Sequence, residues 1–141
     1  MGMINERDRE LIKKEFAGLT GQVKLINFTQ ELECQYCRET NMLIKEIGEL
    51  SPAITTEVYN FITDKEPTEK YKIEQIPATV IMGEKDYGIR FYGIPSGYEF
   101  VTMLESIKMI AAGESGLSQK SKDFLRDLKE PVNLKVFVTP T

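Results

Sequence analysis

Cys34 and Cys37 are the reactive residues of this 141-residue chain and its only cysteines. Their C-x-x-C spacing suits thiol–disulfide exchange, metal binding or simple burial of two thiols. The chain has no histidine, so Ser-His and Cys-His nucleophile pairs, histidine metal ligands and imidazole catalysis are excluded within it. A disulfide between residues three apart closes only a tiny loop, so it adds little as a structural staple.

The elements around the two cysteines favour the redox interpretation. Residues 23–29 are short, apolar and β-branched, which predicts a strand, and from about Cys34 to Leu50 apolar residues fall near helical spacing. A helix N-terminus favours a thiolate, so Cys34 is the expected nucleophile and Cys37 the thiol that resolves a mixed disulfide. Glu31 and Glu33 act against that thiolate through their negative charge.

Two other interpretations of the cysteines stay open. They are two inert buried thiols, or they are half of a metal site. Structural zinc requires four nitrogen or sulfur ligands, so the metal site would have to be a Cys₄ site, or an iron–sulfur cluster, shared between two chains.

The remaining pattern predicts an α/β chain with the order αβαβαββα. We expect helices over residues 5–19, 34–50, 66–71 and 97–112, strands over 54–62 and 88–92, and a strand directly after Pro77 that ends at Met82. In the first and last of these helices the apolar stripe is expected to include Leu11 and Val101.

The segment after Gly113 repeats the start of the chain. Ser118 is a candidate N-cap for a further helix, and residues 132–138 form a second strand-like run, aligned with residues 23–29 at an offset of 109. The pattern predicts an internal repeat that is cut short.

Composition excludes several partners. The net charge of −4 and the absence of a dense basic block argue against nucleic acid, and no apolar run is long enough for a bilayer span or a signal peptide. We therefore expect a cytoplasmic protein. Because no phosphate-binding glycine loop or dinucleotide fingerprint is present, no bound cofactor is expected, and NADPH or flavin is expected on a separate reductase.

Three segments together carry a family resemblance: the CQYC of residues 34–37, the IPAT of residues 76–79 and the YGIRFYGIPSGYEF of residues 87–100. The chain resembles the glutaredoxin-like protein disulfide oxidoreductases of thermophilic prokaryotes, which carry two thioredoxin-fold units in tandem. The resemblance implies a thioredoxin-like fold with a mixed central sheet flanked by helices and an extra N-terminal helix. It also implies a first unit over residues 1–112, and a linker, first helix and first strand of a truncated second unit over 113–141, without the second C-x-x-C.

For the site, the resemblance implies a protein disulfide oxidoreductase with Cys34 and Cys37 as its catalytic pair. It further implies that Pro77 is cis and that Ile76, Pro77 and Tyr36 contact the substrate. The expected partners are protein thiols or disulfides and a thioredoxin-reductase-like flavoprotein. The competing hypothesis is a peptide-binding module of the same fold whose cysteine pair is idle.

Residues 132–138 are also a candidate contact between chains. The run is β-prone, carries Lys135 as its only charge, and lacks the strands with which it would pair in a complete second unit. We expect this strand to mediate a homodimer.

Overall fold

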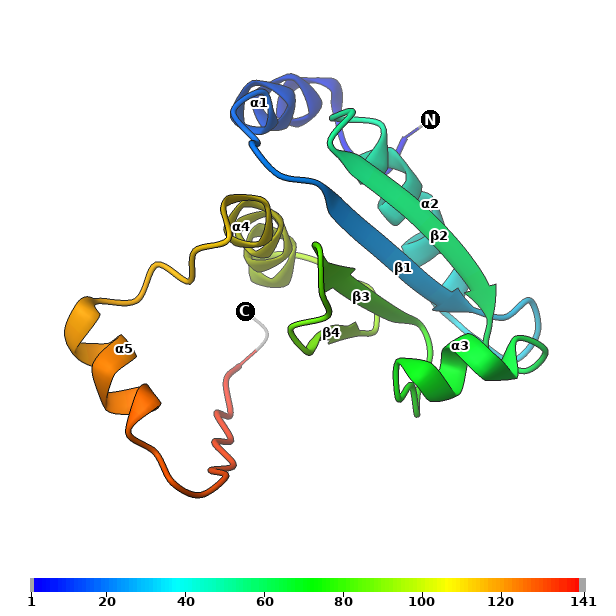
Figure 1. Cartoon of the computed structure of the whole chain (residues 1–141). Coiled ribbons are helices and arrows are strands. Elements are labelled where there is room, and N and C mark those ends of the chain that lie inside the picture. Colours follow the sequence, from blue (N-terminus) through cyan, green and yellow to red (C-terminus); the bar gives the residue numbers. More distant parts are fainter. Residues whose placement is uncertain (1, 140–141) are drawn as a thin grey trace.

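The structure of the protein is a computed structural model, which describes residues 2–139. Figure 1 shows the elements in chain order, which are α1 (Glu6–Phe16), β1 (Val23–Thr29), α2 (Cys37–Gly48), β2 (Ile54–Asn60), α3 (Lys65–Lys70), β3 (Ala78–Met82), β4 (Ile89–Tyr92), α4 (Tyr98–Ala112) and α5 (Gln119–Arg126). The expected order is confirmed, and the side chain of Asn5 caps α1 by accepting from the Asp8 backbone N–H at 2.9 Å.

The four strands form one mixed sheet in the order β2-β1-β3-β4. β1 pairs with β2 in parallel, while β3 is antiparallel to both β1 and β4. A parallel pair requires a crossover, and α2 provides it between β1 and β2. The loop that follows the central strand β1 leads into α2, which places the two cysteines beyond the C-terminal end of a buried central strand.

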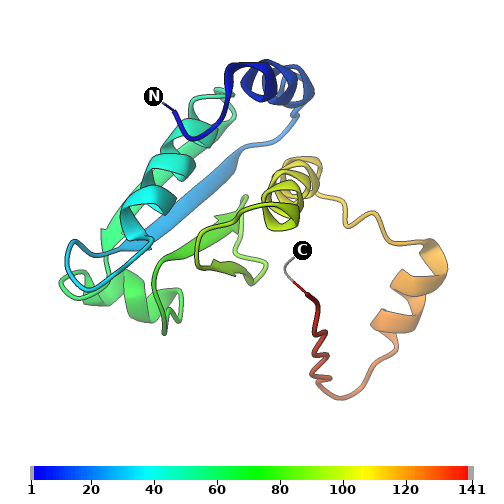
Figure 2. The same ribbon diagram turned by 180° about the vertical axis from the view of Figure 1, so that it is seen from behind.

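Two cores lie on opposite faces of the sheet because successive side chains of β1 alternate. Val23 and Leu25 belong to the larger core, with buried residues of α1, α2 and α4, whereas Ile26 and Phe28 belong to a smaller one with Tyr71. Figure 2 shows α2 and α4 in front of the sheet when it is seen from behind.

Several sequence expectations need correction within this unit. The helices expected to end at residues 19 and 50 end at Phe16 and Gly48. The cysteine-bearing helix begins at Cys37 and not at Cys34, and the strand predicted to reach Ile62 ends at Asn60. Leu11 and Val101 are exposed, because the buried stripes of their helices follow Ile12 and Phe16 in α1 and residues 103, 104, 107 and 111 in α4. Only the side of a helix that faces the sheet is buried, so apolar residues beside that stripe remain in solvent.

The strand predicted over residues 132–138 is not formed. These residues have no regular secondary structure and are exposed, with Phe137 at 92%. An extended segment forms a strand only when its backbone groups pair with a neighbour, and this segment has no strand neighbour in the sheet of the described chain. α5 lies away from the sheet, beyond α4, in both views (Figures 1 and 2). None of the helices described in residues 2–139 is long and apolar enough to cross a membrane.

Candidate functional site

Cys34 and Cys37 form a disulfide, with Cα atoms 5.5 Å apart. The two sulfurs differ in accessibility. Cys37 is 1% exposed at the first position of α2, while Cys34 lies half-buried in the preceding loop. An attacking or attacked sulfur must be accessible, so the geometry fits Cys34 as the sulfur that meets a partner.

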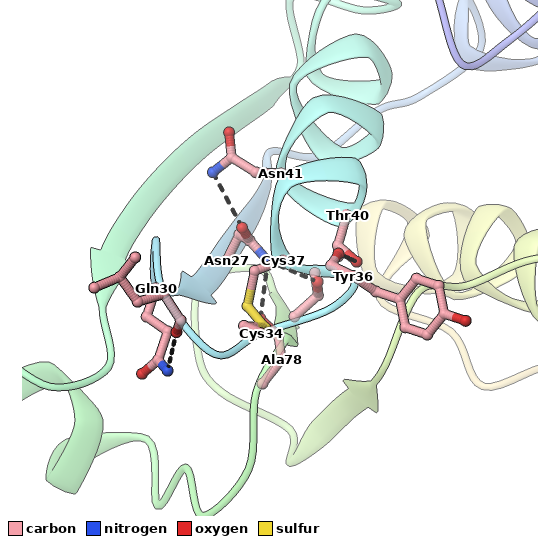
Figure 3. Close-up of a disulfide and its surroundings, with 10 residues drawn as sticks. Asn27, Gln30, Cys34, Tyr36, Cys37, Thr40, Asn41 and Ala78 are labelled. Carbon is pink, nitrogen blue, oxygen red and sulfur yellow. Dashed lines mark hydrogen bonds between the residues drawn. A yellow bond between two sulfur atoms is a disulfide. The ribbon is translucent and has the colours of Figure 1, made fainter.

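The start of α2 is held by Tyr36, the N-cap residue. Its carbonyl accepts from both the backbone N–H of Thr40 at 3.0 Å and the Thr40 hydroxyl at 2.7 Å. The Tyr36 side chain is 47% exposed, and its ring points away from the disulfide in Figure 3. The shift of the helix start to Cys37 leaves Cys34 outside the helix, but its bond to Cys37 still holds its sulfur at the helix N-terminus.

The loop before Cys34 has an unusual backbone. Glu33 adopts a positive φ of 55°, which is uncommon for a residue other than glycine. The side-chain amide of Gln30 donates to the Leu32 carbonyl and closes the same loop. Such left-handed residues concentrate at functional sites, where the surrounding structure imposes the strain.

Pro77 follows a cis peptide bond after Ile76, as the family resemblance implied. Pro77 is buried, and its carbonyl accepts from the Gly93 backbone N–H at 2.8 Å. Ile76 is half-buried and packs against the smaller core. Neither of its backbone groups is hydrogen-bonded within the described chain.

Sequence analysis missed two asparagines in the surroundings of the disulfide, which Figure 3 shows. Asn27 of β1 is completely buried, and its amide nitrogen donates to the Ala78 carbonyl at 3.1 Å. Its amide oxygen accepts from Asn41 of α2 at 3.2 Å. A signal was available, because Asn27 is the polar residue between Ile26 and Phe28 in an otherwise buried strand.

A cavity of about 680 Å³ opens beside Cys34, and several charged or polar side chains line it. Glu31, Arg38, Asn41 and Asp64 are among the residues that line it. A second hollow, of about 720 Å³, lies between α4 and α5, is mainly apolar, and contains neither cysteine. In residues 2–139 no group of three or more histidine, cysteine or acidic residues is arranged to hold a metal ion.

Comparison with known proteins places this geometry in a family. The thioredoxin domain model matches residues 22–105. A protein disulfide oxidoreductase from Aeropyrum pernix is 27% identical, with a TM-score of 0.79, over 89% of this chain and 55% of that one. The NTD_N/C domain of alkylhydroperoxide reductase AhpF from Enterococcus faecalis is 25% identical, with a TM-score of 0.75, over 85% of this chain and 58% of that one.

Thioredoxin from Fasciola hepatica shares the fold at 17% identity and a TM-score of 0.54, over 70% of this chain and 90% of its own. No curated protein sequence matches the chain. The chain spans little more than half of the Aeropyrum and Enterococcus structures. The thioredoxin match covers more than half of its residues, together with the α/β sheet and the cysteine pair at the start of α2, and the chain therefore belongs to the thioredoxin-domain family.

Proposed function

We propose that the protein exchanges disulfides with protein substrates through Cys34 and Cys37. The observation that carries the proposal is the asymmetric disulfide, whose Cys34 is accessible from a cavity while Cys37 is buried at the helix start. An oxidised pair of this kind in a thioredoxin fold is what reversible exchange requires.

The exchange balances as follows when the reduced pair meets a substrate disulfide. The Cys34 thiolate attacks one substrate sulfur, forms a mixed disulfide and releases the other substrate sulfur as a thiolate. The Cys37 thiolate then attacks the Cys34 sulfur, which forms the Cys34–Cys37 disulfide and releases the second substrate thiolate. Two electrons pass to the substrate, and the two protons of the cysteine thiols end on the substrate thiols. Every step runs in reverse from the oxidised pair.

The substrate segment is proposed to lie against Ile76 and Pro77. In the described chain the backbone groups of Ile76 are unpaired beside the buried Pro77, and an extended peptide can add main-chain hydrogen bonds there. The Tyr36 ring is 47% exposed and is proposed to supply further apolar area to the substrate.

Substitution of each cysteine separates the two roles. We expect the wild-type protein to reduce insulin with dithiothreitol as electron donor, Cys34→Ser to abolish that activity, and Cys37→Ser to accumulate mixed disulfides. A matched control is Ser106→Ala, which removes a buried hydroxyl of α4. Full activity in Cys34→Ser would rule out the proposed function.

The competing function is peptide binding with an idle cysteine pair, and the acidic side chains of Glu31 and Glu33 before Cys34 favour it. The reduction potential of the pair decides between the two functions. A potential well below about −300 mV would describe a structural bridge, whereas a working pair has a higher potential.

The electron source is proposed to be a separate NADPH-dependent reductase of the thioredoxin-reductase-like flavoprotein class. The similarity to a domain of an alkylhydroperoxide reductase supports coupling to such a partner. Consumption of NADPH by a purified thioredoxin reductase, dependent on this chain and on Cys34, is the expected result.

Residues 113–141 are proposed to begin a second unit of the same fold. Ser118 caps α5 by accepting from the Ser121 backbone N–H at 3.2 Å, which confirms the N-cap predicted from the sequence. The exposed apolar side chains of α5, Phe124 and Leu125, are further support, because an amphipathic helix normally covers a sheet. A chain extended past Thr141 is expected to bury them, which limited proteolysis would detect as protection.

A further inference from the structure

Asn27 is a fully buried polar residue that joins three elements near the disulfide. From β1 it donates to the Ala78 carbonyl of β3 at 3.1 Å, and it accepts from Asn41 of α2 at 3.2 Å. Asn41 lies one helical turn after Cys37 and lines the cavity beside Cys34. A chain of hydrogen bonds therefore runs from that cavity, through the interior, to the residue that follows Pro77.

The Ala78 carbonyl determines which way the Asn27 amide points. A side-chain amide has one accepting and one donating end. Because a backbone carbonyl can only accept, the Asn27 nitrogen is directed at Ala78, and the Asn27 oxygen is left to accept from the Asn41 nitrogen, which fastens the amide to α2. The opposite orientation would place two oxygens against each other at Ala78.

The carbonyl groups that follow the cis bond are held by hydrogen bonds. The Pro77 carbonyl is held by the Gly93 N–H at 2.8 Å, and the Ala78 carbonyl is held by Asn27. Proline has no N–H of its own. With both carbonyls after the cis bond engaged, the backbone groups of Ile76 are the ones left for a partner.

We propose that Asn27 and Asn41 form an uncharged relay that positions the backbone around cis-Pro77, so that Ile76 is presented to a protein substrate while α2 holds Cys37. Both are positioning residues, and the idea rests on the proposed disulfide exchange. The relay is neutral: in residues 2–139 the buried polar side chains are those of Asn27, Thr40, Ser51, Thr79 and Ser106, none of which is ionisable.

The test compares a protein disulfide with a small one. Asn27→Ala and Asn41→Ala are expected to lower kcat/KM for insulin about tenfold, mainly through KM, because misplacement of a positioning contact has effects of this order. Both variants should reduce bis(2-hydroxyethyl) disulfide within about twofold of wild type, since this molecule is too small to use the loop. The control Ser106→Ala also loses a buried hydrogen bond, made to the Thr102 carbonyl, and should change neither rate.

Two further variants sharpen the test. The double variant Asn27→Ala/Asn41→Ala should lose no more than Asn27→Ala alone, because the two amides act in series. Asn27→Asp should keep the relay only while its buried carboxyl is protonated and can donate to Ala78. Its insulin activity is then expected to fall with rising pH relative to wild type. If Asn27→Ala fails to fold, Asn41→Ala and Asn27→Asp still test whether the two asparagines position the loop around Pro77.

An activity-independent measurement separates this proposal from the proposed function. Hydrogen exchange at the Gly93 amide, which bonds the Pro77 carbonyl, should become faster in Asn27→Ala than in Ser106→Ala. Two results would overturn the relay even if the protein exchanges disulfides: an unchanged rate of hydrogen exchange at the Gly93 amide, or equal losses of activity with insulin and with bis(2-hydroxyethyl) disulfide. If the wild-type protein reduces neither disulfide, the proposed function fails, and Gly93 protection alone decides whether the relay holds the loop.

Discussion

The carboxylate of Glu46 is the polar group that ties the N-terminal segment to the helix carrying Cys37. It accepts from the backbone N–H of Met3 at 2.6 Å and of Ile4 at 3.0 Å, and it pairs with Arg9 at 3.2 Å. Burial by itself raises the pKa of Glu46, but the hydrogen bonds from Met3 and Ile4 and the charge of Arg9 outweigh it and leave the pKa below the ordinary 4.5. The ionised form therefore stabilises the folded chain.

Glu46→Gln is expected to lower the free energy of unfolding at pH 7 by about 1–3 kcal/mol, the usual size for hydrogen bonds to a charged group. In the wild type this contribution is complete above the unfolded-state pKa and is lost as the pH falls through the lower folded-state pKa. The variant should therefore show a shallower loss of stability below about pH 5. Urea unfolding at several pH values measures both effects. Glu49→Gln is the control, because Glu49 is 70% exposed and 3.8 Å from Arg9, and a variant there as destabilised as Glu46→Gln would contradict the argument.

The end of α2 packs on β2 through a glycine. A Cβ atom added at Gly48 would lie 2.5 Å from the Thr56 methyl carbon, closer than atoms approach in proteins. Alanine is otherwise more favourable than glycine in a helix. A loss of stability in Gly48→Ala would therefore report the close contact with Thr56.

Gly48→Ala is expected to destabilise the protein by about 1–2 kcal/mol through overpacking. Thr56→Ser removes the obstructing methyl group, so the double variant Gly48→Ala/Thr56→Ser should recover most of the loss. Thermal unfolding of the two single variants and the double variant completes the cycle. Additive losses in the double variant would show that the helix end does not meet β2 as described.

Association of the whole molecule is predicted to depend on residues 132–138. Their apolar side chains, including those of Val136 and Phe137, are exposed, and their backbone belongs to no sheet in the part of the chain that the structure describes. Strand pairing between two chains would bury both, which is why self-association stays a prediction of this sequence.

Sedimentation is expected to show a dimer for the full chain and a monomer after deletion of residues 131–141. Val136→Lys should also give a monomer, since a charge on a pairing strand opposes association. Lys129→Ala, outside the segment, is the control. The disulfide and its surroundings lie in the thioredoxin domain, so insulin reduction should be unaffected by the deletion. A monomeric full chain at every concentration would contradict the prediction.

Features that depend on the local order of residues along the chain could be predicted from the sequence. Strand β1 was predicted at its observed bounds because a short run of apolar, β-branched residues is flanked by polar ones. The capped start of α1 and the position of Pro77 directly before β3 have equally local causes. The cysteine spacing indicated the chemistry, and the segments shared with a known family indicated the cis bond.

Contacts between residues of different elements became known only from the folded structure. The hydrogen bonds of Asn27 join residues 51 and 14 positions apart, and periodicity within one element holds no information about such contacts. The same limit explains Leu11 and Val101, whose exposure depends on how far the neighbouring layer reaches. It also explains residues 132–138, which have strand composition but no strand. Backbone hydrogen bonds of a sheet are made between segments, so a strand exists only where the fold supplies its partner.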